Sequence, residues 1–309
     1  MLSQMPASQK GYILFRMGGA TDAVIIGNPN SGRAGSREYL ERCAAILRSG
    51  GLDVEVLNTE RPDHATELAA SSGDRFVIAA GGDGTVNEVI NGLGDGATLG
   101  ILPLGTANVL ARELGLPLDA EGACERLLKG ETIEMDLGVA RRELDGVERR
   151  FSCMAGVGFD AKVIRAVTPR LKDNLRGLAF ALMAFKVLFQ ENFPPVRVSG
   201  DGATHVVPFA IVANAHRYGG VYRVSKPGLL TSGKLEVILI KRVSLLLRPD
   251  IFASIMARRP LDRSVESYSA GEVRAESSEA EVPVQLDGEL WGTLPMSFRI
   301  EPAALKVVC

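Results

Sequence analysis

The stretch FVIAAGGDGTVNEVING, residues 76–92, decides the fold class of this 309-residue chain. Its first five residues are all apolar, which is typical of a strand buried on both faces of a parallel sheet. A glycine-rich loop, Gly81 to Thr85, follows at once, and a helix through Ile90 is expected next. Thr85 and Glu88 have the spacing of a capping box, which marks Thr85 as the start of that helix. Glycine N–H groups in front of a helix N-terminus suit a di- or triphosphate.

The same alternation of strand and helix continues on both sides of this stretch. Strands are expected at 23–26, 52–57 and 98–102, and helices around 40–47 and at 62–70, 106–114 and 119–129. This alternation predicts βαβ units and a doubly wound sheet, the α/β class. We expect this α/β domain to span residues 22–132, after a flexible extension over residues 1–21.

After about residue 133 the alternation of strands and helices gives way to a pattern of mainly short strands. Strands are expected at 206–213, 234–240, 282–286 and 296–300, most of them short, with Asp-Gly turn signals between extended stretches. Helical patches are expected at 174–190 and 244–258. The pattern predicts a mainly β second domain over residues 133–302.

Two further loops, like the glycine loop, directly follow strands of the expected sheet. The segment 103–108 follows the strand at 98–102, with Thr106 as the expected N-cap, and the segment 28–33 follows the first strand. All three loops lie at carboxyl ends of strands in one expected sheet, where open α/β sheets bind ligands. Asp83 is a carboxylate beside the expected phosphates, which favours a shared Mg²⁺. The alternative is a set of ordinary turns and caps without a ligand.

A separate feature is Asp287-Gly288-Glu289, between two strand-like segments. A hairpin turn explains the Asp-Gly pair without any function. The other interpretation is that the turn holds Glu289 as a general base.

Charge and composition exclude other classes. Lys and Arg number 35 against 37 Asp and Glu, so binding to nucleic acid through charge is not expected. The four cysteines form no C-x-x-C pair and the three histidines show no ligand spacing, so no disulfide framework or zinc site is indicated. No segment approaches ~18 uninterrupted apolar residues and no signal peptide is recognisable, so a soluble, cytoplasmic protein is expected.

These motifs together resemble a known family. GGDGTVNEVING (81–92), LPLGTANVLARELGLP (102–117) and LDGELWGTLP (286–295) resemble the soluble diacylglycerol kinase catalytic-domain family, in its bacterial lipid kinase branch. The resemblance implies an α/β nucleotide domain of the NAD kinase and diacylglycerol kinase type beside a β-sandwich, with ATP in the cleft. It also implies that the last strand, about 303–309, returns to the first domain.

The resemblance implies an ATP-dependent lipid kinase that uses Mg²⁺ and phosphorylates a hydroxyl of a membrane lipid, diacylglycerol-like, with peripheral contact at the inner face of the membrane. Glu289 would accept the proton of the lipid hydroxyl, and Asp83 would hold the metal. Glu289→Gln and Asp83→Ala are each expected to lower turnover at least ~100-fold. Matching by motif gives the residues that would contact ATP or its metal: Asn28, Thr59, Gly81, Gly82, Asp83, Gly84, Thr85, Val86, Asn87 and Thr106.

The chain departs from the family pattern in two places. Val109 stands where many relatives have Asp, which leaves the acceptor open among diacylglycerol, phosphatidylglycerol, a sphingoid base and an undecaprenyl-type alcohol. Thr231 and Ser232 stand where relatives have the acidic ligands of a structural Mg²⁺. Two other functions remain open: an NAD kinase, and a degenerate kinase that binds nucleotide or lipid as a regulator.

The lipid side of the function also has a candidate segment. Residues 175–189 are apolar on nearly every face and follow Arg170, Lys172 and Arg176. They are either a buried helix of the β domain or a basic-edged flap that touches anionic lipid.

Overall fold

The computed structural model describes residues 10–12, 23–28, 36–167, 183–184, 186–188, 193–218, 222–223, 229–241 and 266–309. The chain divides into two units. The first comprises residues 1–137, 230–232 and 302–309, and the second comprises residues 138–229 and 233–301.

The first unit is built on a parallel sheet. Its strands are β2 (Ala23–Gly27), β3 (Val54–Asn58), β4 (Phe76–Gly81) and β5 (Thr98–Pro103). They lie in the order β5-β4-β2-β3, and all their pairings are parallel. The end of β19 (Met296–Val308) joins the sheet in parallel beside β5, with Lys306 opposite Thr98 and Val307 opposite Leu99.

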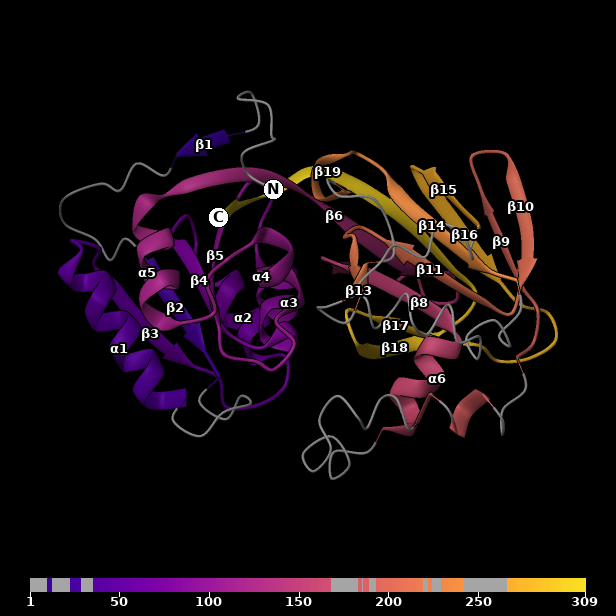
Figure 1. Ribbon diagram of the computed structural model, residues 1–309, viewed down its shortest axis with the longest axis horizontal. Coiled ribbons are helices and arrows are strands. Elements are labelled where there is room, and N and C mark those ends of the chain that lie inside the picture. The colour runs from indigo at the N-terminus through magenta and orange to yellow at the C-terminus, as the bar shows by residue number, and fades with distance from the viewer. Residues whose placement is uncertain are drawn as a thin grey trace. The chain divides into compact units, whose positions relative to one another are not determined.

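Helices cover both faces of this sheet (Figure 1). They are α1 (Ser36–Ser49), α2 (His64–Ala70), α3 (Asp83–Gly92), α4 (Val109–Leu114) and α5 (Ala120–Lys129). Leu47 of α1 and Leu127 of α5 share one core cluster with Ile25 and Ile78 of the sheet. Because successive strand residues point to opposite faces, Val24 and Ile26 pack on the other face, where α2 and α3 lie. The doubly wound α/β fold expected from the sequence is confirmed.

The second unit is a β-sandwich. One sheet has the order β15-β14-β11-β8-β17-β18, and the other contains β10-β9-β16-β19 together with β6 and β7. Val157 and Val237 of the first sheet share a core cluster with Val198 and Phe298 of the second. The expected sandwich is therefore confirmed. The strands of this unit are β7 (Glu148–Phe151), β8 (Met154–Gly158), β9 (Val196–Gly200), β10 (Ala203–Val207), β11 (Phe209–Ala213), β12 (Arg217–Tyr218), β13 (Tyr222–Arg223), β14 (Leu235–Ile240), β15 (Glu266–Ala270), β16 (Glu272–Glu276), β17 (Pro283–Leu286) and β18 (Glu289–Thr293).

Two long strands contribute residues to both units. They are β6 (Glu131–Arg142) and β19, with 12 and 13 residues. No strand was expected at 131–142, and β19 joins into one strand the two that were expected at 296–300 and about 303–309. Ala303 has a φ of 50° at the point where β19 enters the first unit, and its N–H donates to Asp136 Oδ1 of β6 at 2.8 Å. This contact ties the first-unit parts of the two strands together.

Some expected elements differ from the observed ones. The single strand expected at 206–213 is two strands, β10 and β11, because Pro208 cannot donate a ladder hydrogen bond. Residues 10–12, inside the expected extension, form β1 (Lys10–Tyr12), which pairs antiparallel with the start of β6. The remaining elements are α6 (Phe159–Ala166) and a 3₁₀ turn at Leu229–Thr231.

The expected helix at 244–258 lies outside the described residues, and so does the one at 174–190 apart from residues 183–184 and 186–188. Among the residues that are described, each helix is too short or too polar to cross a bilayer.

Candidate active site

The first group of candidate residues lies at the carboxyl edge of the parallel sheet. The strand ends are in register there, with Gly27 opposite Ala80 and Gly81 opposite Pro103. The Asn28 N–H donates to Ala80 O at 3.2 Å, and the Thr59 N–H donates to Gly27 O at 2.8 Å. The edge therefore brings together Asn28, Thr59, the glycine loop and the loop after β5. The rest of the loop that follows β2, residues 29–35, lies outside the described residues.

The glycine loop and the loop after β5 touch through glycine backbone. A Cβ on Gly105 would lie 2.6 Å from the Cα of Gly82, which no real side chain allows. Leu104 N–H donates to Gly81 O at 2.8 Å beside this contact. The two loops can lie this close only because position 105 lacks a side chain, whereas a Cβ on Gly82 would lie 3.4 Å from the Gly105 Cα.

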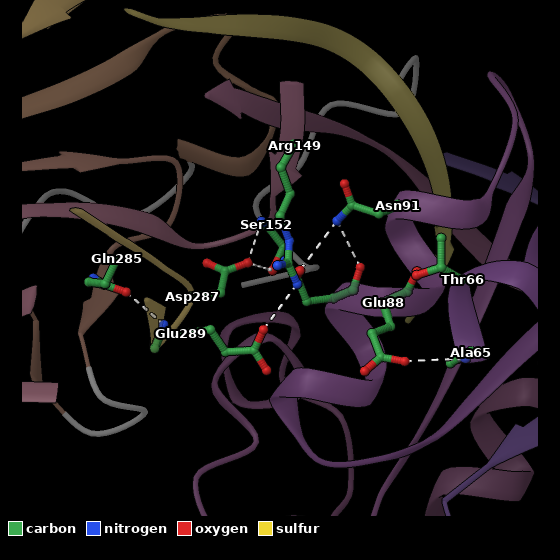
Figure 2. Close-up of polar contacts among 11 residues, drawn as sticks. Ala65, Thr66, Glu88, Asn91, Arg149, Ser152, Gln285, Asp287 and Glu289 are labelled. Atoms are coloured by element: carbon green, nitrogen blue, oxygen red, sulfur yellow. Dashed lines mark hydrogen bonds and ion pairs between the residues drawn. The ribbon is translucent and has the colours of Figure 1, made fainter. Parts of the chain in front are cut away.

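Helix α3 begins three residues earlier than the expected capping box requires. Its N-cap is Gly82, without a side-chain cap bond, and its first residue is Asp83. The expected Thr85–Glu88 capping box is therefore wrong, since Thr85 already lies inside the first turn. Glu88 Oε2 instead accepts from the N–H of Ala65, in the first turn of α2, at 3.2 Å (Figure 2). Glu88 thus caps a neighbouring helix instead of its own.

Asp83 makes a similar contact with α4. Its Oδ1 accepts from the N–H of Val109, the first residue of α4, at 2.5 Å. The expected Thr106 cap is wrong, because the N-cap of α4 is Asn108, with a φ of 47°, and Thr106 is exposed. Asp83 therefore joins the glycine loop to the start of α4.

The expected nucleotide-contacting residues on α3 differ in accessibility. Gly82, Asp83 and Gly84 are partly exposed, whereas Thr85, Val86 and Asn87 are buried. The exposed group therefore carries the N–H donors and the carboxylate that a ligand can reach, and the buried group packs behind it.

The donor chemistry at Asp83 fits magnesium. Mg²⁺ in nucleotide sites is commonly held by one or two carboxylates, with phosphates and waters completing its shell. Asp83 offers one partly exposed carboxylate, one oxygen of which is engaged by Val109. Across the described part of the chain, no group of three or more His, Cys, Asp or Glu side chains gathers as a metal cluster.

The second group of candidate residues surrounds the β17–β18 hairpin. Asp287 and Gly288 have φ values of 48° and 92°, and Leu286 pairs with Glu289 across the turn. Positive φ at both central residues is the type I′ hairpin that Asp-Gly favours. Glu289 is consequently the first residue of β18.

The Asp287 carboxylate is saturated with hydrogen bonds (Figure 2). Oδ2 accepts from Ser152 N at 2.7 Å and Ser152 Oγ at 3.0 Å. Oδ1 accepts from the N–H groups of Cys153 and Met154, both at 2.9 Å. Asp287 thus anchors the turn to the start of β8 and has a structural role in addition to forming the turn.

A buried polar pair supports the other side of the turn. Gln285 Oε1 accepts from the N–H of Gly288 at 2.7 Å, and Gln285 Nε2 donates to Asp160 Oδ2 at 2.6 Å. Gln285 and Asp160 are both buried. Gly156 makes room for them, since a Cβ there would lie 2.2 Å from Asp160 Oδ2.

The side chain of Glu289 contacts an arginine from a distant part of the chain. Arg149 of β7 donates from Nη2 to Glu289 Oε2 at 3.0 Å, and Figure 2 shows the two side chains pointing toward each other. The Arg149 side chain is 20% exposed and that of Glu289 is 45% exposed.

Sequence reasoning missed Arg149, Ser152 and Asp160. Arg149 and Glu289 lie 140 positions apart, so no local pattern links them. Gln285 carried a usable signal, because it is a polar residue inside an apolar strand, the kind of residue that needs a buried partner.

Two family models match the chain. The diacylglycerol kinase catalytic domain matches residues 22–140, and the YegS C-terminal NAD kinase beta sandwich-like domain matches residues 153–309. A diacylglycerol kinase of Bacillus subtilis is 30% identical over 89% of this chain and 92% of its own length. One of Staphylococcus haemolyticus is 28% identical over 89% of this chain and 84% of its own length.

Solved structures share the fold. A diacylglycerol kinase structure from Bacillus anthracis covers 93% of this chain and 96% of its own, with a TM-score of 0.70 and 21% identity. Yeast NADH kinase complexed with NADH covers 93% of this chain and 83% of its own, with a TM-score of 0.53 and 13% identity. The two family models and the Bacillus subtilis relative confirm the expected enzyme class, a kinase, and the chain belongs to the diacylglycerol kinase family.

Proposed function

We propose that this protein transfers the γ-phosphate of ATP to a hydroxyl group of a diacylglycerol-like membrane lipid. The observation that carries the proposal is the pair of glycine loops held together at the carboxyl edge of the parallel sheet, in a chain of the diacylglycerol kinase family. The first unit would hold the nucleotide, and the second would supply the base.

The start of α3 would receive the phosphates. Gly82 caps this helix without a side-chain hydrogen bond, unlike α5, where Asp119 accepts from the N–H of Gly122. N–H groups at an uncapped helix start attract anions through their donors and the helix dipole. Gly82 and Gly84 keep the approach clear of side chains. Asn28, Thr59 and Thr106 lie on the loops at the same edge and would contact the rest of the nucleotide.

Asp83 would hold Mg²⁺ through its carboxylate, which also accepts from the N–H of Val109. The bound ion supplies positive charge against the β- and γ-phosphate oxygens. Asp83 itself would orient that ion while the hydrogen bond from Val109 to Oδ1 keeps α4 in position.

Glu289 would act as the general base. A lipid hydroxyl is a weak nucleophile, so Glu289 takes its proton as the oxygen bonds to the γ-phosphorus. The bond from the γ-phosphorus to the β–γ bridging oxygen breaks, and ADP leaves with that electron pair. Glu289 then returns the proton to solvent.

The lipid acceptor implies that the enzyme works at a membrane surface. ATP and the lipid head group are both available from the cytoplasm, so the enzyme would act at the inner face of the membrane. The basic-edged segment 170–189 remains the candidate for lipid contact, although it lies almost wholly outside the described residues. Val109 starts α4 beside Asp83, so the residue that differs from many relatives lies next to the proposed metal ligand.

The test is turnover of ATP with a panel of acceptors. The panel contains diacylglycerol, phosphatidylglycerol, a sphingoid base, an undecaprenyl-type alcohol and NAD. We expect transfer to a lipid and none to NAD. Glu289→Gln should lower kcat at least about 100-fold, because it removes the base and keeps the shape of the side chain.

The matched control is Glu281→Gln, at an exposed glutamate just before β17 in the same unit. It should keep turnover within about twofold of the unmodified protein. Transfer to NAD alone would establish the NAD kinase alternative. Binding of ATP without transfer to any acceptor would favour a regulator. Undiminished turnover in Glu289→Gln would exclude Glu289 as the base.

A further inference from the structure

The backbone of Glu289 is held firmly, but a glutamate side chain remains free unless something binds its carboxylate. Asp287 is anchored by four donors, and Gly288 is held by Gln285. These contacts fix where β18 begins. They do not fix the rotatable bonds that separate the Glu289 backbone from its carboxylate, and a long side chain pays rotamer entropy to adopt one position.

Arg149 is the group that binds this carboxylate. Its Nη2 lies 3.0 Å from Glu289 Oε2, a charge-assisted hydrogen bond. Arg149 is the more buried partner, since its side chain is only 20% exposed. A guanidinium that is itself confined by its surroundings holds a partner more rigidly than two mobile surface chains do.

We propose that Arg149 is a positioning residue that aims the Glu289 carboxylate at the acceptor hydroxyl. Arg149 engages Oε2, which directs Oε1, the second oxygen of the carboxylate, to the proton that must be removed. The inference rests on the proposed role of Glu289 as the base. Arg149 itself touches neither ATP nor the lipid in this proposal.

Strand β7 provides a matched control. The next residue, Arg150, points to the opposite face and pairs with Glu301 through Nε at 3.1 Å. The exposed fractions of the two arginine side chains are close, 20% for Arg149 and 22% for Arg150. Arg149→Met and Arg150→Met therefore each remove one arginine–glutamate pair from the same strand, and only the first affects Glu289.

The experiment is a double-mutant cycle on the full chain, with kcat and the KM for ATP measured on the accepted lipid. Arg149→Met should lower kcat about 10- to 100-fold, because misplacing a catalytic group by about 1 Å has effects of this size. The KM for ATP should stay within about twofold, and Arg150→Met should keep kcat within about twofold. Arg149→Lys should recover part of the lost kcat, because it restores a positive donor.

The cycle separates positioning from other roles. In the Glu289→Gln background, Arg149→Met should lower kcat by less than about twofold, because the group it positions is already gone. An equal fold loss in both backgrounds would show that Arg149 acts independently of Glu289, and an unchanged kcat in Arg149→Met would overturn the proposal outright. If Arg149→Met does not fold, the same cycle is measured with Arg149→Lys, whose effect on kcat should again be smaller in the Glu289→Gln background than in the unmodified protein. Full turnover of Glu289→Gln would instead refute the proposed function, so the two failures are distinguishable.

Discussion

In the proposed mechanism Asp83 has two roles, since it binds the metal ion and caps helix α4. Its Oδ1 accepts from the N–H of Val109, the first residue of α4, and the same carboxylate is the proposed ligand of Mg²⁺. Removing the whole side chain would therefore combine a loss of catalysis with the loss of a cap on α4. Asp83→Ala should therefore also lower stability, because helix caps contribute about 1 kcal/mol.

Asparagine separates the two tasks of Asp83. Asp83→Asn keeps an oxygen that can accept from Val109 and removes the charge that Mg²⁺ requires. We expect kcat to fall at least about 100-fold with stability changed by less than about 1 kcal/mol. Asp83→Ala should lose the same activity and about 1 kcal/mol more in stability. Turnover assays and urea unfolding measure the two quantities. Normal turnover in Asp83→Asn would exclude Asp83 as a metal ligand and leave only its role as a cap on α4.

Among the elements of the first unit, helix α3 contacts the first turns of two neighbouring helices. Its Asp83 caps α4 and its Glu88 caps α2, so two carboxylates of one helix satisfy the first turns of two others. Thr66 Oγ1 also donates to Glu88 O at 2.9 Å, and Gly92 lets α2 approach closely. The glycine loop at the start of α3 is thereby held between its neighbours.

The contact between the two loops predicts the effect of a single methyl group. Gly105→Ala would put a Cβ 2.6 Å from the Gly82 Cα, so the loops must move apart. We expect a loss of about 1–3 kcal/mol in stability and weaker ATP binding. The control is Gly94→Ala, at an exposed position whose Cβ would meet no atom within 4 Å. Urea unfolding and calorimetric titration with ATP give both readouts. Equal behaviour of the two variants would argue against the close loop contact.

At the scale of the whole molecule, the end of the chain completes the first unit. Val307 and Val308 of β19 are fully buried, and Cys309 N–H donates to Glu131 O at 3.0 Å. The earlier residues of the same strand, including Met296 and Phe298, lie in the core of the second unit. The first unit therefore cannot complete its sheet until the last residues of the chain are present.

This arrangement predicts which strands a mutation at the end of β19 destabilises. Val307→Ala removes two buried methyl groups beside Leu99 and should cost about 2 kcal/mol. Hydrogen exchange should quicken in β4 and β5, while β8, β11 and β14 of the second unit keep their protection. Lys306→Ala, at the exposed neighbouring position, should leave the exchange pattern unchanged. Equal acceleration in both units would show that they unfold as one cooperative body.

Element identities in the first unit were largely predictable. The apolar runs of β2, β4 and β5 and the helical spacing of Leu40 and Leu47 are local patterns set by burial, so they can be read along the chain. Helix starts were less predictable. Thr85 and Thr106 have good capping chemistry, but their backbone positions are decided by contacts with other elements, such as Asp83 with Val109.

The glycine loops and the Asp-Gly turn were predictable from the sequence, because each depends on residues that lie next to one another in the chain. The resemblance of these local motifs also gave the enzyme family and named Glu289 as a candidate base. Backbone freedom at glycine and helix-start chemistry act within a few residues. The support of Glu289 by Arg149 and the anchoring of Asp287 by Ser152 were decided only by the tertiary structure. Arg149 and Glu289 lie on strands of different sheets, 140 positions apart, and only the packing of the second unit brings a guanidinium to that carboxylate.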